Sequence, residues 1–85
     1  MKKIIMGIQV GDRREDALEV QKLLTEYGCI IKTRLGLHDT GSKGNVCSEQ
    51  GLIILEFIME VEDQIKELAE KLKQLQEIKM NMMEF

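Results

Sequence analysis

Hydrophobic residues recur at every second position in several segments of the chain. Residues 1–11, 29–38 and 77–85 alternate between apolar and other side chains, and residues 51–59 are almost wholly apolar. A period of two is typical of β-strands. The apolar run at 51–59 predicts a strand that is covered on both of its faces.

Between these segments the hydrophobic period lengthens to that of an α-helix. Residues 13–27 and 61–75 both carry apolar side chains three and four positions apart, with charged residues elsewhere. Asp12 and Glu15 have the spacing of a capping box at the start of the first helix. The two apolar stripes consist of Ala17, Val20, Leu24 and Tyr27, and of Val61, Ile65, Leu68, Leu72 and Leu75.

The order of these elements is β-α-β-β-α-β, in a single domain of residues 1–85. Right-handed crossovers place both helices on one face of a four-stranded antiparallel sheet, so we predict an α+β fold of the ferredoxin-like class. The first and third strands are then central, and the second and fourth are edges. Residues 39–50, which are rich in glycine and serine, form the loop between the second and third strands.

The face of the sheet away from the helices is predicted to be apolar. A monomer does not normally leave several hundred Å² of contiguous apolar surface in water. We therefore expect identical chains to pair through this face or edge to edge, as a homo-oligomer. The alternative is that the loop at 39–50 or a chain end lies across the sheet. The residues expected at the interface are Ile5, Gly7, Ile53, Leu55 and Phe57.

Composition narrows the classes of function. The 85 residues carry a formal net charge of −3, with basic residues interspersed among acidic ones. A nucleic-acid-binding protein normally has a basic face, so direct nucleic-acid binding is not expected.

The apolar runs fall short of the roughly 20 residues that span a bilayer, and no signal peptide is recognisable. We therefore expect no membrane contact and a cytoplasmic location, where Cys29 and Cys47 do not form a disulfide framework. Cys29 is predicted to be a small buried residue.

His38 and Cys47 flank the loop at 39–50 and form the one suggestive set of metal ligands. Imidazole and thiolate bind transition metals such as zinc, nickel, copper and iron. Two donors do not complete a coordination shell, so a second copy of the chain or a bound cofactor would supply the others. The alternative is that His38 is a surface residue of an edge strand and Cys47 a loop thiol.

Sequence motifs of catalysis are missing. No nucleophile elbow and no HExxH motif occurs, and the segment Gly41-Ser42-Lys43-Gly44 lacks the strand-to-helix context of a phosphate-binding loop. An enzyme is therefore not expected.

Several stretches together resemble a known family. They are Val10-Gly11-Asp12-Arg13, Arg34-Leu35-Gly36-Leu37-His38, Cys47-Ser48 and Gly51-Leu52-Ile53-Ile54-Leu55. With them the chain resembles, over essentially its whole length, the small regulators associated with iron-only hydrogenase systems. The resemblance implies an ACT-like domain related to the C-terminal domain of nickel-responsive repressors, which assembles into oligomers and binds metal between subunits.

Residue by residue, the resemblance gives metal-ligand counterparts to His38 and Cys47 alone. Gly36 stands where a second strand histidine of the nickel site would be expected. The repressors also carry a DNA-binding segment before this domain, and we expect this chain to lack one because its first strand begins at residue 1.

Three functions remain open. The first is a regulatory, oligomeric, ligand- or metal-responsive module of an iron-only hydrogenase system, in which a ligand at a subunit interface favours one assembly over another. The second is a protein-interaction adaptor that docks through its sheet face or an edge strand, with His38 and Cys47 incidental. The third is a small enzyme or metallochaperone.

Overall fold

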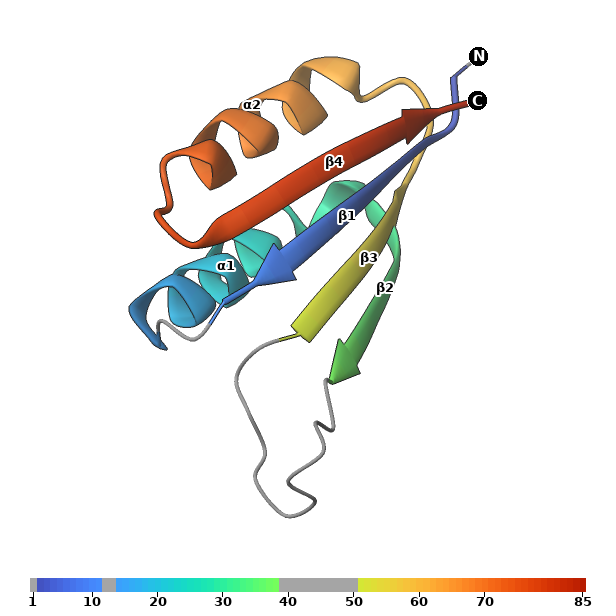
Figure 1. The fold of residues 1–85 in the computed structure, drawn as a ribbon. Helices are drawn as coiled ribbons and strands as arrows, with labels where there is room; N and C mark the ends of the chain where they lie inside the picture. Colours follow the sequence, from blue (N-terminus) through green and yellow to red (C-terminus); the bar gives the residue numbers. More distant parts are fainter. Residues whose placement is uncertain (1, 12–13, 39–50) are drawn as a thin grey trace.

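A computed structural model describes residues 2–11, 14–38 and 51–85, and it confirms the predicted α+β fold. The antiparallel sheet has the order β2-β3-β1-β4, and both helices lie on one of its faces (Figure 1). The first and third strands are central, as the element order and the right-handed crossovers predicted. The elements are β1 (Ile4–Val10), α1 (Arg14–Glu26), the 3₁₀ turn η1 (Gly28–Ile30), β2 (Ile31–His38), β3 (Gly51–Phe57), α2 (Glu62–Lys73) and β4 (Ile78–Glu84).

The core lies between the sheet and the two helices. Met6 and Ile8 of β1 and Leu55 of β3 are fully buried under Leu24 of α1 and Leu68 of α2. Truncating one of these side chains to alanine removes about 2–5 kcal/mol of stability, because the core closes only partly over the cavity. Alternation along β1 therefore fixes which face of the sheet the helices cover.

Tyr27 connects the two helices at the end of α1. Its hydroxyl donates a hydrogen bond to Oε1 of Glu67 at 2.7 Å, and Nζ of Lys71 lies 5.1 Å from the centre of its ring. Lys71 also pairs with Glu67 at 3.8 Å, one helical turn away. Hydrogen bonding to the Tyr27 side chain is the main cause that raises the pKa of Lys71 above its ordinary value, and the charge of Glu67 acts in the same direction.

Two local predictions were wrong around the start of β2. The strand begins at Ile31 rather than at residue 29, because residues 28–30 form a 3₁₀ turn after α1. Cys29 lies in this turn and is exposed, with its thiol free. The prediction of a buried Cys29 failed because it placed the residue on the strand. The proposed capping box at Asp12 lies outside the described residues.

Candidate functional site

The face of the sheet opposite the helices is built from alternate residues of all four strands. Strand register places Ile5 opposite Glu56 and Met83, and Gly7 opposite Ile54 and Asn81. None of the described helices covers this side (Figure 1). We call it the open face, and its residues are Ile5, Gly7, Gln9, Thr33, Leu35, Leu37, Leu52, Ile54, Glu56, Lys79, Asn81 and Met83.

The open face carries an aliphatic strip along β2 and β3. Leu37 lies opposite Leu52, and Leu35 lies opposite Ile54. Leu35 and Leu37 remain 51% and 47% exposed, although cross-strand pairs of this kind pack against each other. A strip of four large aliphatic side chains, three of them exposed and Ile54 half-buried, is typical of an interaction surface.

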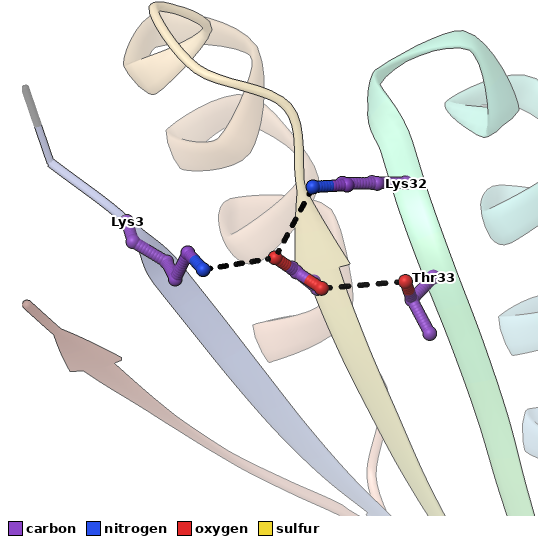
Figure 2. A network of polar contacts seen from close by, with 4 residues as sticks. Lys3, Lys32 and Thr33 are labelled. Carbon is purple, nitrogen blue, oxygen red and sulfur yellow. Dashed lines mark hydrogen bonds and ion pairs between the residues drawn. The ribbon is translucent and has the colours of Figure 1, made fainter.

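One end of the open face is polar and centres on Glu56 of β3. Its carboxylate pairs with Nζ of Lys3 at 3.4 Å and with Nζ of Lys32 at 3.9 Å, and it accepts a hydrogen bond from the Thr33 hydroxyl at 3.3 Å. Figure 2 shows that these groups converge on Glu56 from both sides, Lys3 from the segment just before β1 and Lys32 and Thr33 from β2. The cluster therefore joins β1, β2 and β3 across the sheet.

The surroundings of Glu56 change its acidity. The hydrogen bond from Lys3 lowers the pKa of Glu56 below its ordinary value, and the charge of Lys32 acts in the same direction. Partial burial opposes this effect but does not outweigh it. Glu56 is consequently ionised at neutral pH and marks the hydrophilic border of the aliphatic strip.

The residues expected at the interface divide between the two faces. Ile5 and Gly7 lie on the open face as expected. Ile53, Leu55 and Phe57 lie in the core instead, where they are 7%, 0% and 3% exposed. The expectation that they line the open face was wrong because β3 is apolar on both faces, so its composition does not say which side the helices cover.

The missed residues of β3 are Leu52 and Ile54, and a signal for them exists in the sequence. Glu56 is the one charged residue within β3, and a charged side chain belongs on the uncovered side of a half-covered sheet. Leu52 and Ile54 stand four and two positions before Glu56, so they share its face.

The proposed metal ligands are placed only in part. His38 is the last residue of β2, and its backbone pairs with Gly51 at the start of β3. Cys47 lies outside the described residues, so the expected meeting of imidazole and thiolate stays a prediction. Among the side chains that the structure describes, which do not include that of His38, no three acidic, histidine or cysteine groups come together as a metal site.

These features define an ACT-like domain of the ferredoxin-like class with an uncovered sheet face. The chain belongs to the TM1266-like family, which is described as "Iron-only hydrogenase system regulator, putative" and whose family model matches residues 2–82. No curated protein matches the sequence. None of the helices in the described part of the chain is long and apolar enough to cross a membrane.

Solved structures show the same fold at low sequence identity. Protein TM1266 from Thermotoga maritima superposes with a TM-score of 0.81 at 23% identity, over 100% of this chain and 99% of that one. A formyltetrahydrofolate deformylase from Pseudomonas putida KT2440 gives 0.52 at 15% identity, over 98% of this chain and 28% of that one. CPII from Thiomonas intermedia K12, solved with ADP, AMP and acetate, gives a TM-score of 0.51 at 16% identity, over 99% of this chain and 85% of that one.

Proposed function

We propose that this chain is a cytoplasmic, non-enzymatic regulatory module of an iron-only hydrogenase system. In this proposal identical chains associate through the open face, and a small ligand or a transition metal bound between subunits changes the assembly. Family membership supports the regulatory role. The observation that carries the assembly is the aliphatic strip of Leu35, Leu37, Leu52 and Ile54 on the open face.

The strip favours association because its side chains are only partly buried in the single chain. Fully burying an aliphatic side chain contributes about 1.5–3 kcal/mol, and a twofold interface buries each residue twice. Glu56, with Lys3 and Lys32, limits the apolar surface at one end and can fix how two copies are oriented.

A ligand at such an interface would act by differential affinity. An effector that binds one assembly more tightly shifts the population toward it, and only by the amount of that difference. The candidate effectors are transition metals, through His38 and Cys47, and small anionic metabolites. CPII was solved with adenine nucleotides, which makes ADP and AMP reasonable ligands to test.

The assembly is tested by its mass in solution. Analytical ultracentrifugation of the full chain should show an oligomer that dissociates on dilution, and Leu37→Lys should weaken association at least about tenfold. Leu18→Lys is the matched control, because Leu18 is 58% exposed on α1, on the other side of the molecule. A chain that stays monomeric at high concentration, or equal effects of the two substitutions, would contradict the proposal.

Metal response is tested by anaerobic equilibrium dialysis against nickel, zinc, iron and cobalt, followed by elemental analysis. Stoichiometric binding that is lost in both His38→Ala and Cys47→Ala would support a metal-responsive module. If the unmodified chain bound no metal, a metal effector would be excluded, and small molecules would remain as the candidate effectors. The same ultracentrifugation experiment, with and without each ligand, then shows which of them alters the assembly.

The second candidate function is a protein-interaction adaptor. It is favoured by the edges of the sheet, where an outermost strand presents one row of backbone groups away from the sheet. Recovery of partners from cell extract should then be unchanged in the double variant His38→Ala, Cys47→Ala. Loss of partners while the fold survives would contradict the adaptor.

A further inference from the structure

The outer edge of β4 has a regular pattern of backbone groups that follows from the bonds of the sheet. Lys3 and Phe85 exchange two backbone hydrogen bonds, at 3.3 and 2.8 Å, and the amide of Gly11 donates to the carbonyl of Glu77 at 3.1 Å. Antiparallel pairs alternate between bonded and non-bonded types. Residues 79, 81 and 83 therefore direct their amides and carbonyls toward β1. Those of Ile78, Met80, Met82 and Glu84 point away from the sheet.

β4 is the outermost strand of the sheet (Figure 1) and is paired with β1 along its whole length without a bulge. No residue of β4 is buried, although Ile78 and Met80 pack against the core. Met82 and Met83 are 45% and 58% exposed on opposite faces of this edge. A long, regular edge with half-exposed apolar side chains is a template for another strand.

The opposite edge is protected. β2 contains a register irregularity between Ile31 and Thr33, and it carries the charged residues Lys32 and Arg34. Both edge strands carry charged residues, but a bulge is one of the usual means by which an edge strand avoids pairing, and β4 has none. Arg34 is moreover held by a hydrogen bond to Gln21 of α1. Of the two edges, β4 is the one suited to pairing.

We propose that β4 pairs antiparallel with β4 of a second copy, with Asn81 opposite its own counterpart, to give one continuous sheet. This register places Ile78 opposite Glu84 and Met80 opposite Met82. All four outward-facing residues then exchange backbone hydrogen bonds with the partner strand. Registers centred on Met80 or Met82 leave Glu84 or Ile78 without such a partner.

Side chains support the same register. Lys79 lies opposite Met83 of the other copy, and neither Lys79 nor Glu84 faces a like charge, which would be unfavourable. Methionine side chains are flexible and adapt to a neighbouring surface, and the pairing covers Met80 and Met82 on the helix side. This inference deepens the self-association of the proposed function but uses an edge rather than the open face.

Cysteine cross-linking tests the register directly. Non-bonded antiparallel pairs have Cα atoms about 4.5 Å apart, which lies within the range of a disulfide. In full-length chains with Cys29→Ser and Cys47→Ser, Asn81→Cys should oxidise to a covalent dimer. Lys79→Cys alone and Met83→Cys alone should not, whereas a mixture of these two variants should form a mixed dimer.

Hydrogen exchange of the unmodified chain provides a second measurement that needs no substitution. In the assembled protein the amides of Met80 and Met82 should exchange at least about tenfold more slowly than after dilution to the monomer. Equal and rapid exchange of both amides in the assembly, or cross-linking at residue 79 as fast as at residue 81, would overturn the inference. Neither measurement involves an effector. Adding Leu37→Lys should leave the Asn81→Cys cross-link intact, so the experiments can reject pairing through β4 without rejecting association through the open face, and the reverse.

Discussion

The carboxylate of Asp16 accepts a hydrogen bond from the backbone amide of Glu77 at 3.0 Å, across 61 positions of sequence. Asp16 lies in the first turn of α1 and is 6% exposed, the one buried charged residue of the described chain. Glu77 immediately precedes β4, and its carbonyl accepts from the amide of Gly11 just after β1. The backbone of Glu77 thus joins the end of β1, the start of α1 and the start of β4.

Asp16→Ala should destabilise the fold by about 1–3 kcal/mol, because it leaves a partly buried amide without its acceptor. Asp16→Asn keeps a side-chain oxygen at the same position and should reduce the free energy of unfolding by less than Asp16→Ala does. Urea unfolding at one fixed protein concentration gives both values, since association would otherwise shift the midpoint. Equal stability of Asp16→Ala and the unmodified chain would mean that water replaces the carboxylate.

Gly11→Ala should be destabilising because a Cβ at this position would be crowded by Glu77, whose backbone is held by its hydrogen bonds to Gly11 and Asp16. A Cβ on Gly11 would lie 3.1 Å from both Cβ and the carbonyl oxygen of Glu77, and relieving such a contact typically costs about 1–3 kcal/mol. Gly36→Ala is the matched control, because a Cβ there meets nothing within 4 Å. We expect Gly36→Ala to be neutral or stabilising by up to about 1 kcal/mol, through the lower entropy of the unfolded chain. Thermal unfolding of both variants should rank them in this order.

How far the sequence predicts this structure depends on the kind of information each position carries. The helices and strands can be predicted from hydrophobic periodicity. The sequence of β1 also indicates which of its faces the helices cover, because Met6 and Ile8 alternate with Gly7 and Gln9. β3 does not, since Ile53 and Ile54 are equally apolar, and only the charge of Glu56 distinguishes its two sides. The hydrogen bond between Asp16 and Glu77 has no signal in the local sequence, because it exists only after the sheet and α1 have packed.

Tyr27→Phe should lower the pKa of Lys71 toward its ordinary value. The Tyr27 hydroxyl is the main cause of the raised pKa, and it also donates to Glu67. Because the pKa of Lys71 is raised on folding, its contacts stabilise the fold fully below the pKa of the unfolded chain. This stabilisation is lost as the pH rises through the pKa of the folded chain. Carbon-13 NMR titration of the lysine side chains measures the pKa. Lys66→Gln on the same helix is a control, and a shift of Lys71 in that variant as large as in Tyr27→Phe would contradict the assignment.

Glu56 should make the sheet sensitive to acid. Its pKa is lowered in the folded chain, so the stability it contributes is fully present above the unfolded value of about 4.5 and is lost as the pH falls through the folded value. Lys3→Met removes the main cause, the hydrogen bond and ion pair at 3.4 Å, and should raise the pKa of Glu56 toward the ordinary range. NMR titration of the glutamate carboxyl carbons reads this shift. Lys2→Met serves as the control, because Lys2 pairs with Glu84 rather than with Glu56. If Lys3→Met and Lys2→Met left Glu56 with the same pKa, the attraction of Lys3 would not be its cause. The border of the open face would then be set by Lys32 and Thr33 instead.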